Sequence, residues 1–282
     1  MKYQELIDDL ISLLIKEDIG DGDHSSLSTI PFDARGKMKL LVKQNGIIAG
    51  IEIAKQIFNR IDSDIKITEQ LLRDGDKITF GDIAFYVEGR IQSLLQAERL
   101  VLNIMQHMSG IATQTSIYVK RLEGLNTKIL DTRKTTPGMR ILDKLAVKTG
   151  GGENHRMGLF DMIMLKDNHI DFAGGIENAI AKAQNYLKRT GRRLKIEIEV
   201  RSIDDVKKVM QIGGVDIIML DNFDIATTRE AVKLINGKYK TESSGGITID
   251  NLRNYAECGV DFISVGALTH QIKSLDLSLK AV

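Results

Sequence analysis

The feature that most constrains the fold is the alternation of short apolar runs with helical stretches in the second half of the chain. β-type runs recur at residues 128–130, 162–165, 196–200, 216–220 and 262–265, and helix-period segments separate them. A chain that alternates strands and helices in this way builds a parallel sheet, because each helix returns it to the same end of the sheet. The sequence therefore predicts an α/β domain with an open or a barrel-like sheet.

The residues that follow these runs favour the barrel. They are reactive side chains or glycines: Asp131 with Arg133 and Lys134, then Lys166, Glu199, Asp221, Ser244–Gly246 and Gly266. In a barrel the carboxyl ends of all strands meet at one mouth, where catalytic groups gather and a phosphate often lies beside the last two strands. An open nucleotide-binding sheet would carry one glycine-rich turn near its start, and neither GxGxxG after a strand nor GxxxxGK[ST] occurs here.

The first part of the chain predicts a smaller α+β domain. An amphipathic helix opens the sequence, "KMKLLVKQNGIIAGIEIAKQIF" indicates a strand, an Asn-Gly turn, a second strand and a helix, and two more short strands flank Gly81. Residues 91–123 are helical by period, with a break expected at Ser109-Gly110. We expect one domain over residues 1–110 and a barrel domain over 111–270, with the tail 271–282 packing back on the first.

The composition excludes several classes of protein. Lys and Arg number 39 against 38 Asp and Glu, a net charge of +1, so the chain lacks the overall basicity of nucleic-acid binders. No run approaches the roughly 20 apolar residues of a membrane span, and the N-terminus has no basic leader typical of a signal peptide. The single cysteine, Cys258, cannot form an intramolecular disulfide, so we expect a buried thiol and a cytoplasmic protein.

Basic residues form the first candidate site. The group comprises Arg133, Lys134, His155, Arg156 and Lys166, near the glycine run 150–152. The planar fork of arginine matches a carboxylate or phosphate, and lysine adds a mobile charge. If these side chains share one mouth, they suit a ligand with several anionic groups; the alternative is a set of separate surface salt bridges.

Acidic residues form the second candidate site. The period of two in "IEIEV" points Glu197 and Glu199 to the same face, the barrel interior, where carboxylates need lysines, arginines or a metal. For Glu197 we favour a stabilising pair with a barrel lysine. Asp221 ends a neighbouring run, and hard oxygen ligands of this kind suit Mg²⁺ shared with substrate phosphates.

Glycine-rich turns after the last two strands form the third candidate site. "SSGGIT" at 243–248 is followed by "SVGALTH" at 264–270. Glycines let backbone N–H groups approach an anion, and a helix N-terminus adds its dipole. A single such turn is weak evidence, but the pair matches the phosphate site of a barrel.

With these motifs in view, the chain resembles the quinolinate phosphoribosyltransferase family. The resemblance is carried by "AERLVLNIMQHMSGIAT", "DTRKTTPGMR", "GGGENHRMGLFDMIMLKDNHI", "IEIEV", "IIMLDNF", "SSGGIT" and "SVGALTH", and it runs from "EDIGDGDHSS" to His270. It implies an N-terminal α/β sandwich domain, an incomplete C-terminal α/β barrel and a homodimer. It also implies a Mg²⁺-dependent transfer of phosphoribosyl from phosphoribosyl pyrophosphate (PRPP) to quinolinate, which releases pyrophosphate and CO₂ and gives nicotinate mononucleotide for NAD biosynthesis.

The resemblance also implies a role for each matching residue. Quinolinate binding falls to Arg133, His155, Arg156 and Lys166, joined by Arg99 of the other subunit. Catalysis around the ribose and the Mg²⁺-pyrophosphate falls to Lys134, Glu199 and Asp221, the last two being the expected metal ligands. The 5′-phosphate falls to Ser244, Gly245, Gly246, Gly266 and His270.

Three alternatives remain at this point. A family of molybdenum-transport-associated proteins shares the fold and much of the motif order, although the intact "TRKTTPG" and "NHR" favour the phosphoribosyltransferase. A class I aldolase-like lyase would use Lys134 or Lys166 as a Schiff-base nucleophile. A noncatalytic protein that binds sugar phosphates would need neither Glu199 nor Lys134 for affinity.

Overall fold

The chain divides into two compact units that interleave along the sequence. The computed structural model describes residues 3–282. One unit comprises Met1–Ser116, Thr135–Gly151 and Leu268–Val282, and the other comprises Ile117–Lys134 and Gly152–Ala267. The long helix α4 (Ile91–Arg121) continues from the first unit into the second, and α11 (Ala267–His270) leads back.

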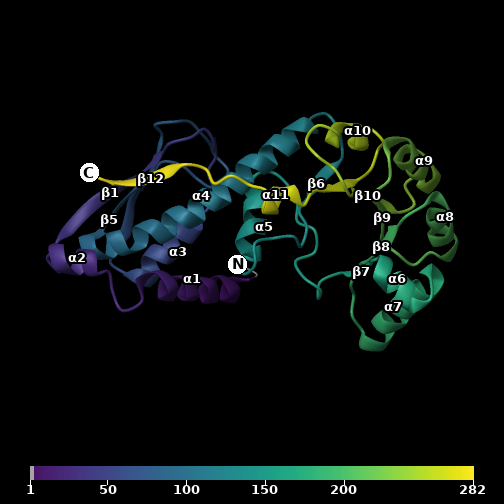
Figure 1. The fold of residues 1–282 in the computed structure, drawn as a ribbon, viewed down its shortest axis with the longest axis horizontal. Coiled ribbons are helices and arrows are strands. Elements are labelled where there is room, and N and C mark those ends of the chain that lie inside the picture. The colour runs from purple at the N-terminus through teal and green to yellow at the C-terminus, as the bar shows by residue number, and fades with distance from the viewer. Residues whose placement is uncertain (1–2) are drawn as a thin grey trace. The chain divides into compact units, whose positions relative to one another are not determined.

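The second unit is built on a six-stranded parallel sheet. Its strands are β6 (Lys128–Leu130), β7 (Ile163–Leu165), β8 (Ile196–Val200), β9 (Ile217–Asp221), β10 (Lys240–Ser244) and β11 (Phe262–Ser264), in the order β6-β11-β10-β9-β8-β7. Its helices are α6 (Asp167–Ala173), α7 (Ile176–Thr190), α8 (Ile203–Ile212), α9 (Ile225–Ile235) and α10 (Leu252–Ala256). Figure 1 shows α7, α8 and α9 along the outside of these strands.

This arrangement confirms the predicted α/β fold class. All ladders between the six strands are parallel. Within the part of the chain that the structure describes, no ladder joins the edge strands β6 and β7, as expected of an incomplete barrel. Strand β8, next to the edge strand β7, is buried along its whole length, because helices cover one side of the sheet and side chains of the other strands fill the interior.

The first unit pairs an antiparallel sheet with helices. The sheet has the order β12-β1-β5-β3, and a separate ladder joins β2 to β4. The strands are β1 (Arg35–Val42), β2 (Gly46–Ile47), β3 (Lys66–Gln70), β4 (Lys77–Ile78), β5 (Ile83–Arg90) and β12 (Leu277–Ala281). The helices wholly within this unit are α1 (Gln4–Ile19), α2 (His24–Thr29), α3 (Ile51–Ile61) and α5 (Arg140–Thr149). Cys258, in the second unit, is buried as expected, and no helix in residues 3–282 is long and apolar enough to span a membrane.

The strand, turn, second strand and helix predicted around Asn45-Gly46 are present as β1, β2 and α3, but β1 and β2 do not pair with each other. β1 pairs with β5 on one side and with β12 on the other, so neither edge of β1 is left for β2. The turn residues have other tasks: the side-chain oxygen of Asn45 accepts a hydrogen bond from the N–H of Phe80 at 2.8 Å. A Cβ at Gly46 would overlap the side chains of Leu275 and Thr113. Glycine is therefore needed here for a close approach and not for a hairpin.

The expected helix break at Ser109-Gly110 is wrong, because α4 is continuous through both residues. The Ser109 hydroxyl accepts a hydrogen bond from the N–H of Ala49 at 2.9 Å, so it serves a neighbouring loop. A Cβ on Gly110 would overlap the carbonyl oxygen of Lys273. The glycine lets the C-terminal segment lie against the helix, where the N–H of Leu275 donates to the carbonyl of Gln106 at 3.0 Å.

We predict that Gly110→Ala destabilises the protein, although alanine is the better helix former. The added methyl group meets backbone atoms of Lys273, which cannot rotate away. Overpacking of this kind lowers the free energy of unfolding by about 1–3 kcal/mol. Gln114→Ala on the same helix is the control and should change it by less than about 0.5 kcal/mol. Urea denaturation measures both, and equal stability of the two variants would contradict the packing of the tail on α4.

Candidate active site

A cavity of about 580 Å³ lies in the second unit at the carboxyl ends of the strands. Its lining is Thr132, Arg133, Lys134, His155, Arg156, Met164, Lys166, Glu199, Met219, Asp221, Asn222, Glu242, Ser244, Gly245, Gly246 and Ser264. We call this cavity the strand-end pocket. It brings together every predicted basic residue of the second unit, the two predicted catalytic carboxylates and most of the first glycine turn. A neighbouring cavity of about 560 Å³ shares Glu199, but its carboxylates outnumber its cations, Arg201 and Lys208, which are paired with Asp171 and Asp205, so it suits an anion less well.

Two arginines set the electrostatics of the strand-end pocket. Arg133 is exposed, whereas Arg156 is only 9% exposed. Burial lowers the pKa of Arg156, and the positive charge of Arg133 lowers it further. Two guanidinium groups close enough to repel each other gain most from a ligand that places negative charge between them. This part of the pocket therefore favours an anion with more than one acidic group.

The loop that carries Arg156 is tied to the edge strand β6. The N–H of Glu153 donates to the carbonyl of Ile129 at 2.8 Å, and that of Asp131 donates back to Glu153 at 3.2 Å. The buried carboxylate of Asp131 then accepts the N–H of His155 at 2.9 Å. The acid that opens "DTRKTTPGMR" thus fixes the loop, and the basic residues after it line the pocket.

Glu199 and Lys166 form an ion pair across neighbouring strands. The Nζ atom of Lys166 lies 2.7 Å from Oε1 of Glu199, whose side chain is 11% exposed. His169 holds the backbone of this lysine, because its Nδ1 accepts a hydrogen bond from the N–H of Lys166 at 3.1 Å. An ammonium group has three donors, so Lys166 keeps donors for a substrate.

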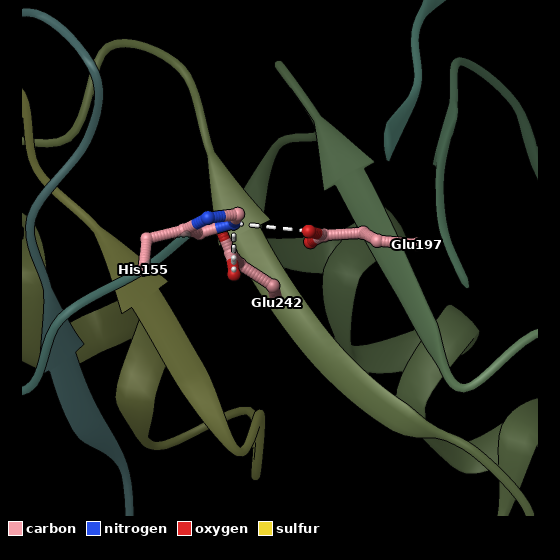
Figure 2. Close-up of side chains that lie close together, drawn as sticks. All are labelled: His155, Glu197 and Glu242. Atoms are coloured by element: carbon pink, nitrogen blue, oxygen red, sulfur yellow. Dashed lines mark ion pairs between the residues drawn. The ribbon is translucent and has the colours of Figure 1, made fainter. Parts of the chain in front are cut away.

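The expectation for Glu197 is wrong. Instead of a barrel lysine, its carboxylate faces His155, with 2.9 Å between Oε2 and the Nε2 of the imidazole. Glu242 on β10 faces the same nitrogen at 3.5 Å (Figure 2). No sequence pattern indicates this partner, because His155 and the two glutamates are far apart along the chain and meet only in the folded structure.

A strained turn positions Asp221 beside the glycines. Asn222 has a φ of 55°, in the left-handed region, and its side-chain amide donates to Oδ2 of Asp221 at 2.8 Å. Its backbone N–H donates to the carbonyl of Ser244 at 2.8 Å. Gly245, with a φ of 95°, has no room for a Cβ because Asn222 lies against it. These contacts hold the ends of β9 and β10 together at the glycine turn formed by residues 244–246.

Three predicted site residues, Gly266, Arg99 and His270, are not among the residues that line the strand-end pocket. Gly266 follows β11, whose last residue Ser264 does line it. Arg99, exposed on α4, and His270, at the end of α11, belong to the first unit.

Six lining residues were not among the predicted site residues: Thr132, Met164, Met219, Asn222, Glu242 and Ser264. Only Glu242 lies outside the quoted motifs. Asn222 belonged to the quoted "IIMLDNF", so the motif itself was the available signal.

Comparisons with known proteins identify the two domains of the chain. Residues 23–109 match the model of the quinolinate phosphoribosyl transferase N-terminal domain, and residues 111–280 match that of the C-terminal domain. The chain is 43% identical over 286 residues to the chloroplastic nicotinate-nucleotide pyrophosphorylase [carboxylating] of Arabidopsis thaliana, covering 96% of this chain and 81% of the relative. It is 41% identical over 270 residues to a probable nicotinate-nucleotide pyrophosphorylase [carboxylating] of Bacillus subtilis, covering 96% and 91%.

A solved structure shows the same fold. The crystal structure of NadC from Streptococcus pyogenes superposes with a TM-score of 0.93 at 37% identity, covering all of this chain and 98% of that one.

We predict that Gly245 and Gly246, the two glycines of the turn after β10, differ in their tolerance of a side chain. Gly245→Ala and Gly246→Ala both place alanine at positive φ, which costs about 1–2 kcal/mol. Only the methyl group at residue 245 also overlaps Asn222, so this variant should lose about 1–3 kcal/mol more. Thermal or urea unfolding without ligands measures the difference. Equal losses would show that Asn222 does not pack against Gly245.

Proposed function

The chain belongs to the quinolinate phosphoribosyltransferase family, and from this premise we propose that it transfers phosphoribosyl from PRPP to quinolinate with loss of CO₂, giving nicotinate mononucleotide and pyrophosphate. The observation that carries the proposal is the composition of the strand-end pocket. Arg133, Arg156 and Lys166 supply positive charge, while Asp221 lies beside the glycine turn. A pyridine with two adjacent carboxylates suits the first group, and a sugar phosphate suits the second.

Substrate binding follows from the charges. Arg133 and Arg156 are the planar donors for the two carboxylates of quinolinate, and Lys166 adds a point charge while it stays paired with Glu199. The backbone N–H groups of the turn at Ser244, Gly245 and Gly246 would hold the 5′-phosphate. This arrangement would hold the pyridine nitrogen facing the anomeric carbon, so that the two substrates react within one cavity.

The chemistry has two steps. The lone pair of the ring nitrogen forms a bond to the anomeric carbon, and the bond from that carbon to pyrophosphate breaks with its electron pair leaving on the oxygen. Glu199 and Asp221 stabilise the positive charge that develops on the ribose, and Lys134 stabilises the leaving pyrophosphate. The bond between C2 and its carboxylate carbon then breaks, and CO₂ departs. The electron pair stays on C2, where the positively charged ring stabilises it, and a proton from solvent then binds to C2.

The residues present also fit a magnesium ion at Asp221. Its carboxylate lines the pocket and is oriented by Asn222, and hard oxygen ligands are those that Mg²⁺ prefers. Glu199, expected from the sequence as the second ligand, is already paired with Lys166, so we assign it to the ribose instead. The ion, when bound, neutralises charge on the pyrophosphate leaving group.

The same pairing disfavours Lys166 as the nucleophile of the lyase alternative. A Schiff-base lysine attacks with a free lone pair, whereas Lys166 donates to Glu199 at 2.7 Å. We further propose a homodimer in which Arg99 of one subunit completes the quinolinate site of the other, and a reducing cytoplasm as its location. The exposure of Arg99 and the burial of the free Cys258 support these two points.

We predict that the purified protein forms nicotinate mononucleotide and CO₂ from quinolinate, PRPP and Mg²⁺. Glu199→Gln should lower kcat by about 10²-fold, because it removes the charge that stabilises the ribose in the transition state. Glu230→Gln, an exposed residue on α9, is the control and should match the parent enzyme. Coupled detection of the mononucleotide and of labelled CO₂ provides the readout. A folded protein that gives neither product would refute the proposed activity.

We also predict that two inactive variants complement each other. Arg99→Ala and Lys134→Ala should each be inactive alone, and mixing them under conditions of subunit exchange should restore partial activity, since a mixed dimer holds one intact site. Subunit exchange is verified with differently tagged chains. Absence of rescue despite exchange would place Arg99 outside the partner's site.

A further inference from the structure

Two fully buried glutamates in the barrel interior have no role in the mechanism above. Glu197 on β8 and Glu242 on β10 are both 0% exposed, and both side chains point at the imidazole of His155, as Figure 2 shows. Within residues 3–282, neither their four carboxyl oxygens nor the Nε2 of His155 has a well-aligned hydrogen bond, although the Ser264 hydroxyl is close enough to Glu242 to lower the pKa of that carboxyl group. Burying carboxyl groups without such bonds costs free energy. The protonation states of the two glutamates and of His155 must therefore leave little uncompensated charge in the cluster.

The other side of the imidazole decides where its proton lies. The backbone N–H of Arg156 donates to Nδ1 of His155 at 2.7 Å. A backbone N–H can only donate, so Nδ1 must be the unprotonated nitrogen of the ring. The ring proton is therefore on Nε2, the nitrogen that lies 2.9 Å from Oε2 of Glu197. In an imidazolium, Nδ1 would also carry a proton, and that N–H would point at the backbone N–H of Arg156. The fold therefore disfavours the doubly protonated ring.

The same contact argues against a metal ion. One ligand atom each of His155, Glu197 and Glu242 lie within 4.8 Å of one another, a spacing that metal ligands also have. A metal on Nε2 would need the lone pair of that nitrogen, and the ring proton would then move to Nδ1, against the N–H of Arg156. The cluster is thus built for a proton and not for an ion.

Charge within the cluster is consistent with this assignment. Burial, followed by the negative charge of Glu197, raises the pKa of Glu242 well above its ordinary value. A Glu242 carboxyl group that keeps its proton removes one of the two negative charges that could face the imidazole of His155. One negative charge and two neutral groups are far cheaper to bury than two carboxylates.

We propose that His155 is a positioning residue, a neutral imidazole held between Glu197 and the backbone of Arg156, and that it is not one of the cations that bind quinolinate. Its task is to fix the backbone at Arg156, so that the guanidinium enters the strand-end pocket. The identity of the anion rests on the proposed function, whereas the state of His155 does not.

The first test is a spectroscopic measurement on the ligand-free protein. The chain has five histidines, so ¹⁵N-histidine labelling gives a simple spectrum, and the His155 signals are assigned by their loss in His155→Asn. We expect an unprotonated Nδ1 and a protonated Nε2 between pH 6 and pH 8. Two protonated nitrogens at neutral pH, or a protonated Nδ1, would overturn the proposal. Metal that copurifies with the protein and is lost in Glu242→Gln would overturn it too.

The second test compares two neutral replacements of His155. Asparagine can place an oxygen where Nδ1 lies, and the chain already uses such a contact, since Oδ1 of Asp167 accepts the N–H of the next residue, Asn168, at 2.7 Å. Leucine offers no acceptor. We expect His155→Asn to keep KM for quinolinate within about threefold, and His155→Leu to raise it about tenfold or more, because a displaced arginine loses a charged hydrogen bond.

The outcomes separate this proposal from the proposed function. If His155 binds quinolinate as a cation, both variants lose the charge and KM rises equally in both, which overturns the positioning role. If the parent protein does not act on quinolinate, the proposed function fails, and the spectrum of the ligand-free protein still decides the state of His155. Should His155→Leu fail to fold, the spectrum and the retained KM of His155→Asn carry the test.

Discussion

The site depends on one constraint, the burial of carboxylates inside a parallel sheet. β8 carries Glu197 and Glu199 on its interior face, and a carboxylate there must be matched by a donor, a cation or a proton. Lys166 reaches Glu199 from the next strand, and His155 reaches Glu197 from the loop after α5. These partners fix where the chain must enter the barrel interior, and the same segments carry the arginines of the pocket.

A second, local constraint shapes the opposite side of the pocket. The left-handed backbone of Asn222 and the two glycines at positive φ bring the ends of β9 and β10 together. Strain of this kind persists only where surrounding contacts hold it, and it often occurs where a ligand must approach the backbone. Here the turn leaves backbone N–H groups beside Asp221, so the anion-binding turn and the acidic group share one rigid support.

Much of this could be read from the sequence, and what could not has physical reasons. The apolar runs at 128–130 and 196–200 coincide with β6 and β8, because buried parallel strands are rich in aliphatic residues. The run "KTESS" of β10 is polar, since its interior side chains serve the site, so periodicity did not reveal it and Glu242 went unnoticed. β3 was missed because it is an exposed, charged edge strand.

The wrong prediction of a helix break in α4 shows that one local signal has several structural uses. Ser109-Gly110 resembles a break, yet Gly110 makes room for the backbone of Lys273, and Gly46 likewise makes room for Leu275 and Thr113. Only the tertiary contacts distinguish a turn from a close approach. Residue roles in the pocket followed from the resemblance, whereas the tautomer of His155 follows from a single backbone contact that no sequence pattern encodes.

The most direct measurement of the central claim is a crystal structure of the protein with quinolinate bound. The two carboxylates should lie in the strand-end pocket within hydrogen-bond distance of Arg133 and Arg156, with Lys166 still paired to Glu199 and the ring nitrogen facing Asp221. Quinolinate bound outside this pocket, or held by residues of the neighbouring acidic cavity, would contradict it.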